Sequence, residues 1–424
     1  MRPKNPRAPA WLKHMVAIAD SAEPPAGARF LFYTNECVGL GHLRRTIHLA
    51  EAVTRRDADA SALLVTGAAA MLHRQPHPRI DTVKLPEISR SSDGGLHAAR
   101  LGMDPAQAHR LRSHLAFAVA ESFDPSVAIV DKTPFGLNDE LTPALEALRA
   151  NPGTRLVLGL RDIEDAPDIV RRQWAGSRLR DRIARFYDTI LVYGPGSAGD
   201  MLDCLELADV GIPVHYVGYV GSPLPSDGPS DLGDGYLLVT AGGGADGYPV
   251  FDAVLRAVAH HGLGVPMVMV TGPLMPAGPR AEITARAAAL GVAAIDARDD
   301  MQSVIVGARA VVAMAGYNTV SEVLRAGKPL LLMPRAGPSQ EQVVRATALC
   351  ADGAARMLSL DEATPAAVSR AIGELLTRTG RVPDRAPYDG AARAARILCD
   401  LACEVDGEFD SARGDQVPVG ARAG

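Results

Sequence analysis

The chain has 424 residues, of which 47% are hydrophobic and 22% are charged, and its net charge is -5. This length predicts more than one domain, each able to bury a full core. The slightly acidic balance, without basic runs interleaved with aromatic residues, argues against a nucleic-acid partner.

The five cysteines form no Cys-x-x-Cys pair, which favours a reducing compartment. No run of about 18 apolar residues occurs, so we predict no membrane-spanning helix. Residues 1–25 are rich in proline and alanine and lack an apolar segment of signal-peptide length. We therefore expect a cytoplasmic protein that begins with a flexible N-terminal tail.

Short apolar segments alternate with helical patterns from residue 26 to residue 222. The first strand is expected at residues 29–34, and helices at residues 46–56 and 107–122 lie between later strands. Such alternation predicts a parallel sheet that is covered on both faces. The other strands expected in this domain are 61–66, 82–85, 127–131, 155–160, 189–192 and 214–217.

Residues 223–235 are rich in proline, glycine, serine and aspartate and are predicted to be a linker. A second alternation follows over residues 236–385. The α/β fold predicted is thus a pair of Rossmann-like, doubly wound parallel-sheet domains that face each other across a cleft. A helix at residues 386–404 would cross back to the N-terminal domain, and residues 405–424 would be a disordered tail. Strands of the second domain are expected at residues 236–240, 266–270, 292–295, 310–314, 330–333 and 355–358.

A glycine loop follows the first strand of each domain. In the first domain Gly39 and Gly41 allow close approach of the backbone, and His42 comes directly after them. At the positive end of a helix the protonated form of His42 would be disfavoured, which suits a general base. A histidine that merely caps a turn is the alternative.

In the second domain, residues 242–247 read GGGADG and satisfy the G-x-G-x-x-G pattern between a strand and a helix. That match alone is weak. A dinucleotide site would also need an acid at the end of the next strand, where Thr271 and Gly272 stand instead. We predict a cradle for phosphate or pyrophosphate and no dinucleotide cofactor, with a merely tight turn as the alternative.

Residues 310–346 form the most informative segment. An apolar strand is expected to end at Met314, and a helix to begin at about Asn318 and to end at Gly327, before a further strand. In a doubly wound sheet ligands lie at this edge, and the N–H groups at a helix start favour phosphate.

These motifs resemble those of GT-B glycosyltransferases. The paired domains, the Gly39-Leu40-Gly41-His42 loop, the run AGYNTVSE at residues 315–322 and QVVRA at residues 342–346 are most similar to family 28, the group that contains the lipid II N-acetylglucosaminyltransferase. The resemblance covers most of residues 28–400. The first loop is also similar to that of the UDP-sugar hydrolase of pseudaminic acid synthesis, so the fold alone does not separate transfer from hydrolysis.

The resemblance implies that Glu322 hydrogen-bonds the ribose hydroxyls of a nucleotide donor. Thr319-x-x-Glu322 also has the spacing of a capping box, which leaves a structural role open. Gln342 would reach the donor sugar, but Glu341 precedes it where lipid II enzymes typically carry a second glutamine, so the sugar is left open. The donor-binding residues implied are Gly243, Gly244, Thr271, Met301, Gly316, Tyr317, Asn318, Thr319, Glu322, Glu341 and Gln342.

Charged residues follow two apolar strands of the first domain and should line the cleft. Asp131 would be a second base or would orient His42, and Lys132, Arg161 and Arg44 would hold an acidic acceptor. Structural ion pairs of Arg161 and Asp162 are the alternative, and residues 89–95 would form a lid. The catalytic residues expected are His42 and Asp131, and the acceptor-binding residues expected are Gly39, Gly41, Arg44, Lys132, Arg161 and Asp162.

Asp57-Ala58-Asp59 is the only Asp-x-Asp in the sequence and lies at the wrong edge of the sheet for a metal site. We therefore predict an inverting, metal-independent glycosyltransferase in which helix N-terminal amides stabilise the leaving diphosphate of a UDP-sugar. The acceptor would be a hydroxyl of a lipid-linked or polysaccharide precursor, with peripheral contact at the inner face of the membrane in the lipid-linked case. The alternatives are a UDP-sugar hydrolase, a non-hydrolysing epimerase and a non-enzymatic nucleotide-binding module.

Overall fold

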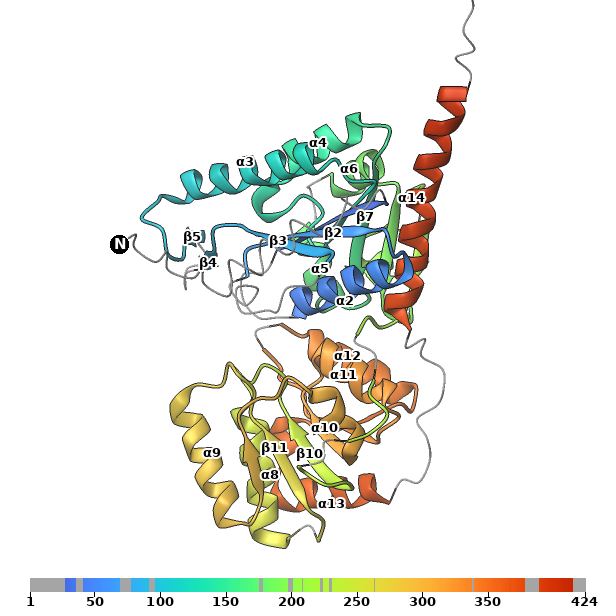
Figure 1. Cartoon of the computed structure of the whole chain (residues 1–424). Helices are drawn as coiled ribbons and strands as arrows, with labels where there is room; N and C mark the ends of the chain where they lie inside the picture. Colours follow the sequence, from blue (N-terminus) through green and yellow to red (C-terminus); the bar gives the residue numbers. More distant parts are fainter. Residues whose placement is uncertain are drawn as a thin grey trace, which may run out of the picture.

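The computed structural model describes residues 27–35, 41–68, 78–90, 96–174, 178–196, 201–207, 209–221, 224–228, 231–262, 264–337, 339–377 and 389–414. These residues form two α/β domains, one above the other in Figure 1, each built on a parallel sheet. The predicted fold class is therefore confirmed. The predicted N-terminal tail, Gly39 and lid residues 91–95 lie outside the described residues.

The sheet of the N-terminal domain is parallel throughout and has the order β3-β2-β1-β6-β7-β8-β9. In central strand β1, Phe30 and Phe32 are buried on one face of the sheet, and Leu31 and Tyr33 are buried on the other. Continuous apolar runs are typical of such strands, because helices cover both faces. The strands are β1 (Arg29–Thr34), β2 (Ser61–Thr66), β3 (Ile80–Lys84), β6 (Val127–Asp131), β7 (Arg155–Arg161), β8 (Thr189–Tyr193) and β9 (Val214–Tyr216).

Helices α3 (Pro105–Phe123) and α4 (Thr142–Ala150) cover one face of this sheet. α3 starts two residues before the expected position, because Asp104 and Gln107 form a capping box and Pro105 occupies the first turn. The smaller elements of this domain are the antiparallel pair β4 (Ile88–Arg90) and β5 (Leu96–Ala98), the 3-10 helix Leu137–Asp139, α5 (Pro167–Trp174), α6 (Leu179–Phe186) and α7 (Met201–Cys204).

Helix α2 (Gly41–Arg56) covers the other face, and the last helix, α14 (Gly390–Gly414), packs against it. Figure 1 shows α14 running along the edge of the N-terminal domain although it follows the second domain in the sequence. The helix continues to Gly414, beyond the expected end at residue 404, because residues 405–414 contain no proline to stop it.

The second sheet has the order β12-β11-β10-β13-β14-β15 and is also parallel. Helices α8, α9 and α13 lie away from the N-terminal domain, whereas α11 and α12 lie next to it (Figure 1). The elements are β10 (Tyr236–Thr240), α8 (Tyr248–His261), β11 (Met267–Val270), α9 (Ala277–Ala289), β12 (Ala293–Ile295), α10 (Met301–Gly307), β13 (Ala308–Ala313), α11 (Tyr317–Arg325), β14 (Leu330–Leu332), α12 (Glu341–Ala351), β15 (Arg356–Met357), the 3-10 helix Leu360–Glu362 and α13 (Pro365–Leu376).

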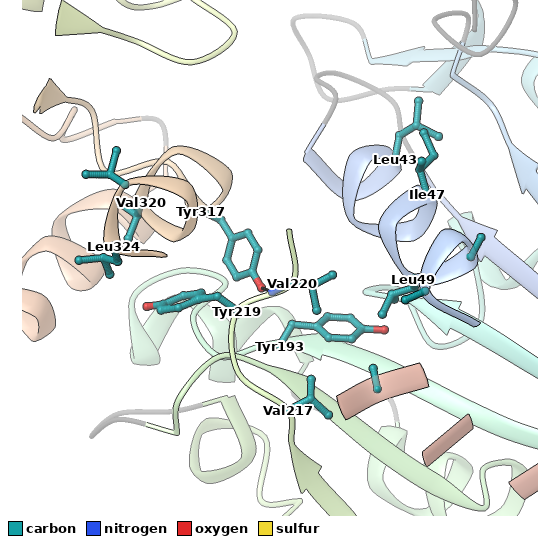
Figure 2. Close-up of a cluster of buried hydrophobic side chains, with 14 of the residues drawn as sticks. Leu43, Ile47, Leu49, Tyr193, Val217, Tyr219, Val220, Tyr317, Val320 and Leu324 are labelled. Carbon is teal, nitrogen blue, oxygen red and sulfur yellow. Dashed lines mark hydrogen bonds between the residues drawn. The ribbon is translucent and has the colours of Figure 1, made fainter. Parts of the chain in front are cut away.

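One apolar cluster is continuous between the domains. It includes Leu43 and Leu49 of α2, Tyr219 in the segment after β9, and Tyr317 and Val320 of α11. Figure 2 shows Tyr219 and Tyr317 close together, between Leu43 and Leu49 on one side and Val320 on the other. The two domains therefore share buried apolar surface. Among the described helices, none is long and apolar enough to cross a bilayer.

Candidate active site

Charged side chains gather where neighbouring strands of the N-terminal sheet end. β1 and β6 are adjacent, with Thr34 paired to Asp131, and β7 ends beside them at Arg161. α2 begins at Gly41, which places His42 in its first turn. Because the carboxyl ends of parallel strands meet at one edge, His42, Asp131 and Arg161 are brought together there.

His42 and Asp131 form a buried hydrogen-bonded pair. Nδ1 of His42 lies 2.7 Å from Oδ2 of Asp131, and the two residues are 8% and 3% exposed. Burial lowers the pKa of His42 to about 4, the charge of Arg161 acts in the same direction, and Asp131 opposes both. The imidazole is therefore neutral at pH 7, which is the state that a general base requires.

Arg45 binds the same carboxylate. Its Nη2 lies 2.7 Å from Oδ1 and 2.8 Å from Oδ2 of Asp131. Burial alone would raise the pKa of Asp131, but Arg45 and His42 outweigh burial and hold that pKa well below its usual range. An ionised carboxylate can only accept, so the proton between Asp131 and His42 belongs to Nδ1. Nε2 of His42 then carries the lone pair.

Residues of the second domain lie opposite this cluster and form the other wall of the predicted cleft. Gly316 is the N-cap of α11, and a Cβ built on it would meet no heavy atom within 4 Å. The glycine loop after β10 lies alongside, because a Cβ on Gly242 would be 3.2 Å from Oγ1 of Thr319. Gly244 has a φ of 88°, and a Cβ there would lie 2.0 Å from the carbonyl oxygen of Thr271, so only glycine fits. Two backbone segments that suit phosphate are thus adjacent.

The two walls touch each other at the start of α2. Nη2 of Arg44 lies 3.0 Å from Oε1 of Glu322, and the Gln302 side chain donates to the same oxygen at 3.2 Å. The Asn318 side chain reaches the carbonyl oxygen of Gly41 at 3.5 Å. The first turn of α2, which carries His42, therefore lies against the N-terminal part of α11.

A second ionic bridge between the domains is centred on Glu341. Its Oε1 lies 3.0 Å from Nη1 of Arg161 and 2.7 Å from Nη2 of Arg345. Burial would raise the pKa of Glu341, but the two guanidinium groups lower it to about 2. Arg345 is fully buried and also donates to the carbonyl oxygens of Ala315 and Ile163, in the second and first domains respectively.

Tyr317 connects helix α11 to the segment that precedes the predicted linker. Figure 2 shows its ring extending from α11 to Val220, whose N–H donates to the Tyr317 hydroxyl at 3.1 Å. The ring meets Tyr219 edge to face with centroids 5.5 Å apart, and the Arg45 guanidinium lies 5.3 Å from its centroid. The first residue of α11 is thus anchored in the N-terminal domain.

Comparisons with known proteins agree with this geometry. Residues 261–393 match the model of the glycosyltransferase family 28 C-terminal domain. Over 271 residues the chain is 25% identical to the UDP-N-acetylglucosamine--N-acetylmuramyl-(pentapeptide) pyrophosphoryl-undecaprenol N-acetylglucosamine transferase of Rhodococcus erythropolis, covering 61% of this chain and 69% of that protein. The solved structure of MurG from Acinetobacter baumannii has the same fold, with a TM-score of 0.54, 15% identity, and coverage of 89% of this chain and 100% of that one. This chain is a glycosyltransferase with the GT-B fold, and its residues 261–393 are similar to the family 28 C-terminal domain.

The fold of this glycosyltransferase is shared beyond glycosyl transfer. A solved structure from Listeria monocytogenes, assigned as a UDP-N-acetylglucosamine 2-epimerase, has a TM-score of 0.55 at 14% identity and covers 92% of this chain and 98% of that one. Identities this low show the fold alone. The details of the reaction are therefore argued from the site.

The predicted donor residues of the glycosyltransferase occupy the wall formed by α10, α11, α12 and the glycine loop. Some have partners within that wall: the Thr271 hydroxyl faces two backbone carbonyl oxygens at 3.3 and 3.4 Å, and Oε1 of Gln342 accepts the N–H of Arg335 at 3.3 Å. Met301 is half-buried at the start of α10. These residues line the proposed donor side, and their contact with a donor stays a prediction.

The predicted acceptor residues separate into two groups. Gly41, Arg44 and Arg161 lie at the cleft, in contact with the second domain. Lys132 pairs with Glu164 at 3.0 Å. Asp162 is 1% exposed and burial raises its pKa to about 6, so its carboxylate is turned into the protein and not toward an acceptor.

Sequence reasoning missed residues that the site of the glycosyltransferase contains. Arg45 and Arg345 are fully buried at the two ionic clusters, and Gln302 binds Glu322. A usable signal existed for both arginines, because Arg45 follows His42 by three positions and Arg345 follows Glu341 by four. Residues at these spacings share one face of a helix.

Proposed function

We propose that this glycosyltransferase is an inverting, metal-independent enzyme that moves a sugar from a nucleotide-diphosphate donor to a hydroxyl acceptor. The donor proposed is a UDP-sugar. The observation that carries the proposal is the neutral His42, oriented by Asp131, beside the open N-terminus of α11. Direct displacement requires a general base for the acceptor and a group that stabilises the leaving diphosphate. His42 and the N-terminus of α11 would supply these two parts from opposite sides.

The reaction follows from this placement. The acceptor hydroxyl gives its proton to Nε2 of His42, and its oxygen forms a bond to the anomeric carbon of the sugar. The bond from that carbon to the diphosphate oxygen breaks, and its electron pair leaves on the diphosphate. Because the oxygen attacks from the face opposite the leaving group, the configuration at the anomeric carbon inverts.

Positive groups near the leaving diphosphate support a reaction without a metal. The N–H groups at the start of α11 and the side chains of Arg44 and Arg161 would stabilise the charge that develops there. The Asp57-Ala58-Asp59 run has another use, since Oδ1 of Asp57 accepts the N–H of Asp59 at 2.9 Å in a local turn before β2.

Calorimetric titration with UDP, dTDP, GDP and ADP, each with and without EDTA, tests the donor assignment. We expect micromolar affinity for UDP that EDTA does not change, because protein groups alone supply the positive charge. Loss of binding in EDTA would contradict metal independence. Preference for another nucleotide would contradict the UDP assignment but not the cleft.

Glu322 is the proposed acceptor of hydrogen bonds from the donor ribose. The capping-box alternative is wrong, because α11 begins at Tyr317, two residues before Thr319, and its N-cap is Gly316 without a side-chain cap. Glu322 instead lies near the middle of the helix with its carboxylate at the cleft, bound by Arg44 and Gln302. A ribose would therefore meet a carboxylate that is already held in place.

The Glu322→Ala variant should bind the donor nucleotide more weakly by about 1.5–3 kcal/mol, the range for hydrogen bonds to a charged group. Calorimetry with UDP measures the change. Glu374→Ala is the matched control, because Glu374 is an exposed glutamate on α13 that pairs with Arg356. Equal affinity of the Glu322 variant and the wild type would refute the ribose role.

A product assay separates this proposal from its alternatives. A glycosylated acceptor supports transfer, free sugar would indicate a UDP-sugar hydrolase, and a changed nucleotide sugar would indicate an epimerase. The Rhodococcus relative acts on a pyrophosphoryl-undecaprenol acceptor, so a lipid-linked precursor is the first acceptor class to test. In that case the enzyme would work in peripheral contact with the inner face of the membrane.

A further inference from the structure

Arg45 is enclosed between the two halves of the site without reaching the cleft surface. Its side chain is 0% exposed, and its guanidinium lies 4.7 Å from the ring centroid of Tyr193 and 5.3 Å from that of Tyr317. Its polar contacts are with Asp131 and with Nδ1 of His42, the latter 2.6 Å from Nη2. Among the described polar groups of the site, Arg45 therefore contacts the proposed base and its orienting carboxylate directly.

The geometry assigns the hydrogens of this cluster. Both carboxylate oxygens of Asp131 lie within 2.8 Å of Nη2 of Arg45, and Oδ2 also lies 2.7 Å from Nδ1 of His42. Because an ionised carboxylate can only accept, this contact favours a proton on Nδ1. By keeping Asp131 ionised, Arg45 thus favours the tautomer in which Nε2 can accept a proton.

Arg45 also changes what Asp131 does to the charge of His42. A carboxylate beside an imidazole ordinarily favours the imidazolium form. Here the guanidinium offsets part of the effect of the carboxylate, so Asp131 orients the ring while promoting its protonation less than an unpaired carboxylate would. The charged groups that surround His42 are Asp131 of β6, Arg45 of α2, Arg161 at the end of β7, Glu164 in the next loop and, across the cleft, Glu322 paired with Arg44 and Glu341 paired with Arg161.

We propose that Arg45 is a positioning residue: it keeps Asp131 ionised and offsets part of its charge, and so favours His42 as the neutral Nδ1–H tautomer, with Nε2 ready to take the proton of the acceptor hydroxyl. This role rests on the proposed function of His42 as the base. It predicts that the protonation of His42 depends on Arg45 even when no substrate is bound.

Nitrogen-detected NMR of the substrate-free, ¹⁵N-histidine-labelled protein tests the proposal, with His42→Gln used to assign the signal. In the wild type we expect the Nδ1–H tautomer and a titration midpoint near the acid end of the range, since the pKa of His42 is lowered to about 4. In Arg45→Gln the midpoint should rise by about 1–3 pH units, because the charge of Asp131 is no longer offset.

Two further variants separate charge from packing. Arg45→Lys retains a positive charge and should keep the midpoint close to that of the wild type. Arg45→Gln combined with Asp131→Asn removes both charges and should return the midpoint to the acid range. An unchanged midpoint in Arg45→Gln would overturn the proposal. If that variant does not fold, the wild type still decides, because an Nε2–H tautomer would overturn it equally.

A pH–rate profile of the same variants distinguishes this inference from the proposed function. The quantity compared is the pH at which activity falls on the acid side, the acid limb of the profile. If Arg45→Gln shifts the NMR midpoint but not the acid limb, Arg45 controls His42 and His42 is not the base. If both shift together, the two proposals are supported jointly. A merely structural role for Arg45 would lower activity equally at every pH and leave the limb in place.

Discussion

Replacement of His42 by alanine should lower turnover by about 10²–10⁴-fold, the usual contribution of a positioned general base, and should leave the affinity for the donor nucleotide unchanged. The nucleotide is expected on the opposite wall of the cleft, at α11, so binding does not need the imidazole. Initial rates of nucleotide release at saturating substrates measure the first quantity, and calorimetry with UDP measures the second.

The pH profile of the wild type provides a second check on His42. Its pKa is lowered to about 4 from an ordinary value of 6.5, so the base form is present throughout the range from pH 5 to pH 8. Activity governed by the free enzyme should therefore fall only as the pH approaches 4. His48→Ala is the control for the His42→Ala variant, because His48 lies on the same helix and contacts Glu51 at 3.5 Å. Equal losses of turnover in His42→Ala and His48→Ala would contradict a catalytic role for His42.

The Arg112→Met variant should unfold with a free energy about 3–5 kcal/mol lower than that of the wild type. Arg112 is 2% exposed, and its Nε and Nη2 each lie 2.7 Å from an oxygen of Glu140, which is fully buried and also accepts from the Tyr33 hydroxyl. Removing the guanidinium leaves a carboxylate inside the N-terminal domain without its counter-charge. Urea denaturation followed by circular dichroism measures the loss.

Two variants decide whether the buried pair is the cause. Arg110→Met removes an exposed arginine from the same helix and should change stability little. Arg112→Met combined with Glu140→Leu removes both charges and should recover most of the loss. A double variant as unstable as the single one would mean that Arg112 contributes through packing and not through its charge.

The strands were predictable because their signal is local. Residues 29–34, 61–66, 127–131 and 236–240 are strands with the bounds expected from their apolar runs. Strands buried on both faces need apolar side chains at nearly every position, and that need is visible in any short window of the sequence. Strand alternation then implied the two parallel sheets.

The starts of helices were less predictable where function shapes them. α2 begins at Gly41, whereas the helix was expected to begin at residue 46. The earlier start was not predicted because the first turn is mostly polar and shows no apolar periodicity. That turn is held instead by His42 and Arg45, both bonded to Asp131 from another strand. A polar partner 86 residues away leaves no mark on local hydrophobicity.

The sequence by itself determined the parallel sheets, the glycine loops at their edges and the kinds of residue that follow the strands, since each depends on neighbouring positions. Only the tertiary structure decided the partners: Arg45 with Asp131, Arg44 with Glu322, and Arg161 and Arg345 with Glu341. These pairs depend on the order of strands in the sheet, on helical turns or on the contact between two domains. A buried charge is stable only beside its counter-charge, and that requirement is met in space and not along the chain.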